Sequence, residues 1–111
     1  MDNVKEHFMK LVEEFNLDFS ECKADMNMNC RTDFYAKYPG VAGFLIESYW
    51  DYDKCIRVAT DCAGNKEEVY FYGNEAYYDF EAARQQVIKM IGEIKKLIVQ
   101  FQIKKMEKDF K

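Results

Sequence analysis

The chain has 111 residues, of which 49% are hydrophobic and 16% aromatic. This length fits one domain and leaves no room for a second, and the apolar fraction excludes an intrinsically disordered chain. The formal net charge of −4 is unevenly divided, because residues 1–42 carry −3, residues 43–81 carry −6 and residues 82–111 carry +5. The composition therefore predicts one folded domain over residues 1–111, with an acidic middle and a basic tail.

Neither a secretion signal nor a membrane span is expected from the sequence. Residues 1–6 are polar and mixed in charge, whereas a signal peptide begins with basic residues followed by an apolar run. No stretch reaches the roughly 18 uninterrupted apolar residues that a membrane-spanning helix requires. We therefore expect a cytoplasmic protein that does not insert into a membrane.

The first predicted element is an amphipathic helix that begins near Val4 and ends near Asn16. Its apolar residues recur at helical spacing, and they are Val4, Phe8, Leu11, Val12 and Phe15. Charged residues occupy the intervening positions, so one side of this helix is predicted to pack on a core.

Over residues 22–31 apolar and polar residues alternate strictly, so the hydrophobic period changes from that of a helix to two. The even-numbered residues are Cys, Ala or Met, and the odd-numbered ones are charged or Asn. A period of two predicts one continuous strand with a buried face and a wet face. The same pattern extends this strand through Phe34 and Ala36, although a short helical turn over residues 32–38 is an alternative. A turn then follows at residues 38–40, where proline precedes glycine.

Three further strands are predicted over residues 43–50, 55–60 and 67–72, with turns at 51–54 and 63–66 between them. The side chains expected to face the core are Phe44, Ile46, Trp50, Ile56, Val58, Val69 and Phe71. Short connections between consecutive strands imply an antiparallel meander, since parallel pairs need long crossovers.

The last predicted element is a helix from about Phe80 to near Phe110, with Asp79 as its N-cap. Its apolar stripe consists of Phe80, Ala83, Val87, Met90, Ile91, Ile94, Leu97, Ile98 and Phe101. A helix of this length is about 45 Å long, whereas the strands span only about 25 Å, so the helix should extend beyond the sheet. We expect the apolar residues of its distal part to meet the N-terminal helix, a second copy of the chain or a target. The fold predicted is α+β: an antiparallel meander of three or four strands, with both helices packed on one face.

No catalytic residue, metal ligand or cofactor site is assigned. The cysteines (Cys22, Cys30, Cys55 and Cys62) contain no C-x-x-C pair and are expected to be reduced thiols, mostly buried. A single histidine, His7, has no nucleophile motif beside it. Residues 25–29 match the start of a calcium loop, but Cys30 and Ala36 stand where the loop needs glycine and glutamate. We expect a protein without enzymatic activity.

The basic tail is not taken as a nucleic-acid site. Its lysines (Lys95, Lys96, Lys104, Lys105, Lys108 and Lys111) lie toward the end of a predicted helix, where cations interact favourably with the helix dipole. The chain as a whole is acidic, and no aromatic and basic residues alternate along one strand. Direct nucleic-acid binding is therefore not expected.

The outward side of the predicted sheet is the preferred candidate for a binding surface. It carries Glu47, Tyr49, Asp51, Arg57, Asp61, Glu68, Tyr70 and Tyr72. Tyrosine is enriched at protein interfaces, and clustered carboxylates attract a basic partner. The alternative is an ordinary solvated face whose tyrosines reflect strand propensity.

No motif identifies a family. In size, acidity and α+β character the chain resembles the small proteins of phages and mobile elements, among them several anti-CRISPR inhibitors. That resemblance implies occlusion of a basic groove on a nucleic-acid-binding enzyme, with carboxylates standing where phosphates bind.

The functional hypothesis is therefore a binding or inhibitor protein that docks on a basic protein partner through Glu47, Tyr49, Asp51, Asp61, Glu68, Tyr70 and Tyr72. The alternative is a structural or assembly protein. In that case it forms a homodimer through Ile98, Phe101 and Met106 of the long C-terminal helix.

Overall fold

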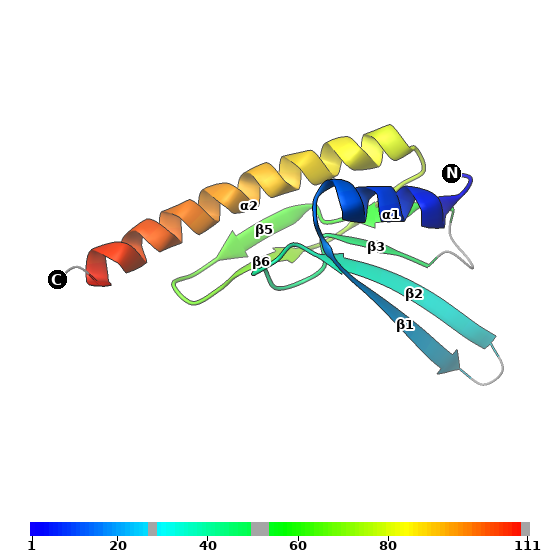
Figure 1. The fold of residues 1–111 in the computed structure, drawn as a ribbon, viewed down its shortest axis with the longest axis horizontal. Helices are drawn as coiled ribbons and strands as arrows, with labels where there is room; N and C mark the ends of the chain where they lie inside the picture. Colours follow the sequence, from blue (N-terminus) through cyan, green and yellow to red (C-terminus); the bar gives the residue numbers. More distant parts are fainter. Residues whose placement is uncertain (27–28, 50–53, 110–111) are drawn as a thin grey trace.

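The computed structural model describes residues 1–26, 29–49 and 54–109, and the side chains of residues 1–22, 33–49 and 54–101 among them. These residues form an α+β fold in which two helices pack on an antiparallel sheet, as predicted (Figure 1). In chain order the elements are α1 (Val4–Glu14), β1 (Asp18–Met26), β2 (Asn29–Lys37), β3 (Ile46–Ser48), β4 (Ile56–Val58), β5 (Asp61–Gly64), β6 (Val69–Tyr72), β7 (Glu75–Tyr77) and α2 (Phe80–Asp109).

The strands divide between two sheets. The larger sheet has the order β1-β2-β3-β4-β7, and all its neighbouring strands are antiparallel. The hairpin β5–β6 forms a second, two-stranded sheet between β4 and β7 in the sequence. The predicted antiparallel order is thus correct for β2, β3 and β4, whereas β1 and β7 are additional strands of this sheet and the predicted strand over residues 67–72 belongs to the separate hairpin.

Helix α1 follows the predicted pattern closely. Val4, Phe8, Leu11 and Val12 are buried, so its apolar side faces the core. The helix ends at Glu14, and Asn16 adopts a left-handed conformation with φ of 51°. Asparagine tolerates this conformation better than most residues, which explains the stop at the predicted position.

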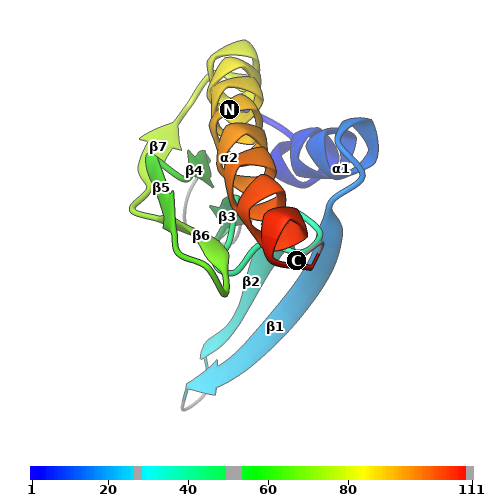
Figure 2. The ribbon, with the colours of Figure 1, turned by 90° about the vertical axis from the view of Figure 1, so that its left-hand side faces the viewer.

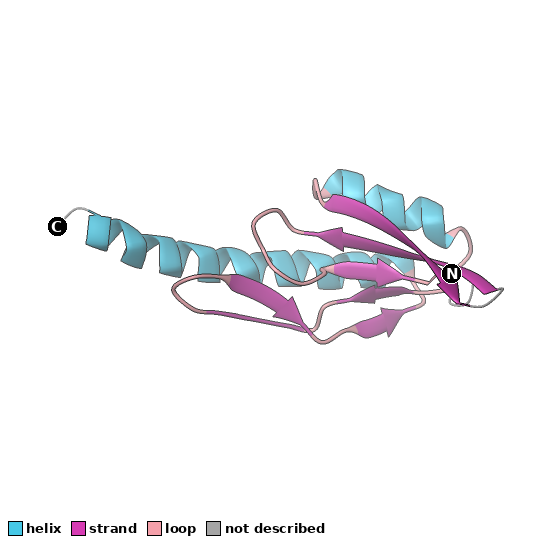
Figure 3. Cartoon of the chain, turned by 90° about the horizontal axis from the view of Figure 1, so that it is seen from below, coloured by secondary structure: helices cyan, strands magenta, loops and turns pink. Residues whose placement is uncertain are grey.

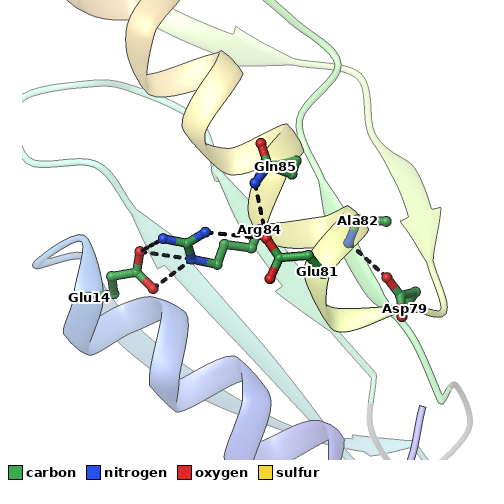
Figure 4. A network of polar contacts seen from close by, with 6 residues as sticks. All are labelled: Glu14, Asp79, Glu81, Ala82, Arg84 and Gln85. Carbon is green, nitrogen blue, oxygen red and sulfur yellow. Dashed lines mark hydrogen bonds and ion pairs between the residues drawn. The ribbon is translucent and has the colours of Figure 1, made fainter.

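Helix α2 begins at the predicted N-cap and lies across the same side of the sheet as α1 (Figure 2). The Asp79 carboxylate accepts a hydrogen bond of 3.0 Å from the Ala82 backbone N–H (Figure 4). Figure 4 also shows the contact between the helices, in which Arg84 donates to both carboxylate oxygens of Glu14, with Nε at 3.0 Å from each. The two helices are thereby held side by side over the core.

The core lies between the helices and the inner face of the larger sheet. Its fully buried members include Phe8 and Leu11 from α1, Ile46, Ile56 and Val58 from the sheet, and Val87, Met90 and Ile94 from α2. Ser48 is also buried, and its hydroxyl donates to the Cys55 carbonyl oxygen at 3.1 Å. The stripe predicted for α2 is therefore the side that covers the sheet.

The prediction of one continuous strand over residues 22–31 is wrong. The chain forms two paired strands there, because β1 ends at Met26, β2 begins at Asn29, and these two residues are register partners. The strand predicted through Phe34 and Ala36 does form, as the second half of β2, and the helical alternative over residues 32–38 does not.

The reversal also changes which residues face the core. Cross-strand partners share a face, so Phe19 and Glu21 of β1 lie on the side of Ala36 and Phe34. Cys22 lies on the opposite side and is exposed, contrary to the expected buried face of even-numbered residues. The sequence signal failed because Asn27 and Met28, which separate the strands, continue the alternation of polar and apolar residues. Residues 27 and 28 themselves lie outside the described part of the chain.

The second predicted strand is shorter than expected. It begins at Ile46 and not at residue 43, because Gly43 has φ of 77° and breaks the extended backbone. Phe44 was expected to face the core, but its side chain is 40% exposed, while Leu45 is buried in its place. The prediction for Trp50 lies outside the described residues.

The region after β4 contains two strands that the sequence did not suggest. Residues 61–64, partly assigned to a turn, form β5, and the turn lies at residues 65–68, where the Asn65 side chain accepts hydrogen bonds from two backbone N–H groups. Val69 and Phe71 face inward and Tyr72 outward, as predicted. Residues 75–77 then return to the larger sheet as β7, beside β4.

Candidate partner-docking surface

The side of the larger sheet opposite the helices, here called the outer face, is covered by neither α1 nor α2 (Figure 3). Across this face Tyr35 stands opposite Glu47, Glu47 opposite Arg57, and Arg57 opposite Ala76. Successive side chains of a strand point to opposite faces. Since Ile46 of β3 is buried on the inner face, its neighbour Glu47 and the residues in register with it belong to the outer face.

Aromatic rings cluster along this face. The Tyr35 and Phe44 rings stack with centroids 4.4 Å apart and an interplanar angle of 28°. The Lys37 Nζ lies 5.3 Å from the Phe44 centroid, and the Arg57 guanidinium carbon lies 5.6 Å from the centroid of Tyr49. Cations are attracted to the faces of such rings. Two basic side chains of the chain itself thus lie over aromatic rings of this face.

Tyr35 is held in its neutral form. Burial, followed by the charge and hydrogen bond of Asp33, raises the pKa of Tyr35 to about 12. The phenol hydroxyl donates to the Asp33 carboxylate at 3.2 Å. At neutral pH the Tyr35 hydroxyl is therefore a hydrogen-bond donor tied to its own strand.

The hairpin β5–β6 presents a second set of exposed side chains. Its register places Asp61 opposite Tyr72 and Ala63 opposite Tyr70. The Tyr70 and Tyr72 rings lie with centroids 6.0 Å apart, and Tyr72 is 51% exposed. These residues alternate with the buried Val69 and Phe71, so they face away from α2.

A shallow groove of about 160 Å³ lies where the two sheets meet. Glu47 and Arg57 of the larger sheet line it together with Phe44, and on the other side it is lined by Tyr72, the last residue of β6, and by Asn74. The Asn74 Nδ2 donates to the Glu47 Oε1 at 3.0 Å, so one hydrogen bond spans the groove. The outer face and the tyrosines of the hairpin are joined by this contact.

The predicted binding residues are only partly brought together. Glu47 and Tyr49 lie on the outer face, and Tyr72 lies across the groove, with Tyr70 and Asp61 beside it. Glu68 lies apart from them, in the turn of the hairpin, where it lines a different cavity beside α2. Asp51 lies outside the described residues.

Three residues of this surface were not predicted. The sequence predicts Phe44 in the core, and it leaves the segment of Tyr35 open between a strand and a short helical turn. The position of Tyr35, one residue away from the apolar Phe34 and Ala36, would have placed it on the outer face once the segment was taken as a strand. Asn74 carried no signal, because its role depends on the position of Glu47, 27 residues earlier.

Two of the residues predicted for self-association, Ile98 and Phe101, face another part of the same chain. Ile98 and Phe101 are half-buried and line a cavity of about 200 Å³ with Gly40 and the β5–β6 turn. The surface that they meet is therefore the chain's own hairpin. Val99, on the same part of α2, is 53% exposed. The side chain of Met106 is not among those described, and homodimer formation stays a prediction.

The thiols have different surroundings. Cys55 is buried, Cys62 is half-buried and Cys22 is exposed. Burial and the nearby carboxylates of Glu93 and Asp61 raise the pKa of the Cys62 thiol, which reduces its reactive thiolate form. Within the described ranges no group of three His, Cys, Asp or Glu side chains has the geometry to hold a metal ion.

Comparison of the chain with protein-family models, with curated proteins and with solved structures gives no significant match. Among the helices of the described residues, none has the length and apolar character needed to cross a membrane. The surface defined above is accordingly interpreted from its own geometry and chemistry.

Proposed function

We propose that the chain is a binding protein whose outer face, with Tyr72 across the groove, docks on a protein partner. The observation that carries the proposal is the placement of Tyr35, Phe44 and Tyr49 with Glu47 on the side of the sheet that neither helix covers. Aromatic side chains contribute large contact areas with few rotatable bonds, which favours them at protein interfaces.

Charge supports a basic partner. Residues 43–81, which supply β3 to β7, carry a net charge of −6. Glu47 lies beside the groove and Asp61 lies opposite Tyr72, and the Asp33 carboxylate accepts the hydrogen bond of Tyr35. Carboxylates at such a surface accelerate encounter with a positively charged partner and select against acidic ones.

Among the residues that the structure describes, the groups with shifted pKa values include no candidate for a general base or an activated thiol. The pKa values of Tyr35, Cys62, Tyr77 and Arg84 are all raised. Each shift moves the group further from neutral pH, whereas a general base or an activated thiol needs a pKa close to it. We therefore propose action by binding alone.

A narrower form of this proposal follows from the resemblance to small phage-borne inhibitors. A basic groove that binds nucleic-acid phosphates would offer the positive surface that Glu47 and Asp61 complement. In this form the chain blocks a nucleic-acid-binding enzyme by covering that groove.

The proposal is tested by affinity capture from the native host with matched variants. The surface variants are Glu47→Lys and Tyr72→Ser, and the controls are Glu13→Lys on α1 and Ile88→Ser on α2, which change charge or apolar area at exposed positions elsewhere. Circular dichroism verifies that each variant is folded. We expect a partner that the wild type and both controls retain and that both surface variants lose.

The prediction is contradicted if the surface variants retain the same proteins in the same amounts as the controls. Self-association through α2 remains a separate proposal, supported by the exposed Val99. Light scattering on wild type and Ile98→Asp tests it, since only a dimer that depends on this helix would be lost in the variant.

A further inference from the structure

Strand β1 forms one border of the larger sheet. Among the described strands it has a neighbour on one side only, β2, so the other side of its nine-residue backbone is unpaired. Every described side chain of the strand, from Asp18 to Cys22, is exposed. The strand contains no proline, whose missing N–H would prevent a further strand from pairing with the border.

The hairpin β1–β2 also extends beyond the rest of the sheet. β3 pairs only with residues 34–36 of β2, so most of the hairpin has no third strand beside it (Figures 1 and 2). A two-stranded ribbon is marginally stable by itself in water. A strand added along β1 would give this ribbon the third member that it lacks.

We propose that the unpaired side of β1 pairs antiparallel with β1 of a second copy, around a two-fold axis beside Cys22. In a symmetric antiparallel pair the axis passes between directly opposite residues, so the residue on the axis faces its own counterpart. Centring on Cys22 is the register that pairs all nine residues of the strand, Asp18 with Met26 at its ends.

Charge supports this register. With Cys22 on the axis, Glu21 stands opposite Lys23 of the other copy, and the symmetry repeats the pair on the other side of the axis. Centring on Glu21 or on Lys23 would place two identical charges opposite each other. Opposite charges in directly facing positions stabilise a pair of strands, and like charges destabilise it.

The arrangement joins two sheets into one continuous sheet and leaves the outer faces free on both copies. It uses a different part of the chain from the proposed docking surface, so either proposal can fail without the other. It also differs from association through α2, because Ile98 and Phe101 have no part in it.

The test uses two charge-reversal variants. Each alone removes the opposite charges that face each other across the axis, and a mixture of the two restores them. Glu21→Lys brings two lysines together across each pair, and Lys23→Glu brings two glutamates together, so each variant alone should dimerise about tenfold more weakly than wild type. Mixed in equal amounts, the two variants place lysine opposite glutamate in both pairs. Sedimentation velocity with one variant fluorescently labelled should therefore show a heterodimer of near wild-type affinity.

A second measurement locates the axis in the wild-type chain. A short bismaleimide should join Cys22 to Cys22 of the other copy, identified by mass spectrometry of the cross-linked peptides, while Ile98→Asp should leave the product unchanged. Thermal unfolding verifies that the charge variants are folded. A chain that stays monomeric at millimolar concentration, or a dimer indifferent to both charge variants, overturns the proposal.

Discussion

Gly43 approaches Phe71 so closely that a Cβ atom on the glycine would lie 2.5 Å from the Phe71 carbonyl oxygen. This approach allows Ala42 to donate to the Val69 carbonyl and to accept from the Phe71 N–H, each at 3.0 Å. These two hydrogen bonds connect the segment before β3 to the hairpin β5–β6. They hold the two sheets together beside the groove and direct Phe44 onto the outer face.

Replacing Gly43 by alanine should therefore destabilise the fold by about 3 kcal/mol, since alanine meets both a disfavoured positive φ and a backbone clash. Gly40→Ala is the matched control, because Gly40 has a similar φ of 81° but nothing within 4 Å of the added Cβ. Gly40→Ala should lower the free energy of unfolding by only about 1 kcal/mol. Urea unfolding measures both, and equal losses would refute the role given to the Phe71 contact.

The Asp79 cap should contribute about 1 kcal/mol to stability, because its carboxylate satisfies a backbone N–H that the first turn of α2 leaves free. Asp79→Ala removes this acceptor, whereas Asp79→Asn keeps one. Chemical unfolding should show the loss for alanine and near wild-type stability for asparagine. An equal loss in both would indicate that charge and not the hydrogen bond matters.

Tyr35 should make the fold sensitive to alkaline pH. Its pKa is about 12 in the folded chain against an ordinary value of 10.0, so the unfolded chain releases the proton first. The stability contributed by the neutral phenol is present below pH 10 and is lost as pH rises toward 12. Tyr35→Phe should reduce this alkaline loss, measured by unfolding at several pH values, while Tyr78→Phe at an exposed position should not.

The thiols should react in the order of their exposure. A maleimide added to the native chain should modify Cys22 first and Cys62 more slowly, since Cys62 is half-buried and its pKa is raised. Cys55 should react only on unfolding. Peptide mapping at successive times measures the order, with the urea-unfolded chain as control. A protected Cys22 would contradict the reversal of faces between β1 and β2.

The sequence was sufficient for the elements whose hydrophobic period is long and uninterrupted. The stripes of α1 and α2, the N-cap Asp79 and the inward-facing Ile56 and Val58 all follow from local spacing, and they are confirmed. Such patterns are reliable because a helix of many turns repeats the same signal several times.

The errors occur where tertiary contacts decide the structure. No glycine or proline lies between β1 and β2, so the alternation of polar and apolar residues continues unbroken although the two strands run in opposite directions. The three residues of β7 are too few to show a period, and they pair with β4, from which the inserted hairpin separates them in the sequence. The outward position of the Phe44 side chain depends on the positive φ of Gly43. This φ is required by the backbone of β6, which lies 28 residues further along the chain.

The same limit applies to the candidate surface. Glu47, Tyr49 and Tyr72 could be identified because strand alternation predicts which side chains face outward. The grouping of these residues in space could not be predicted from the sequence. It depends on the hydrogen bond from Asn74 to Glu47 and on the division of the strands between two sheets. Glu68 was grouped with them because the sequence suggested a single sheet.

The docking proposal is tested most directly by hydroxyl-radical footprinting of the chain alone and in complex with the partner that it captures. Phe44 and Tyr72 are exposed in the free chain, and Ile88 and Val99 on α2 serve as internal references. We predict that oxidation of Phe44 and Tyr72 falls severalfold in the complex while the references are unchanged. Unchanged oxidation of both aromatic residues, with protection confined to α2, would contradict docking through the outer face.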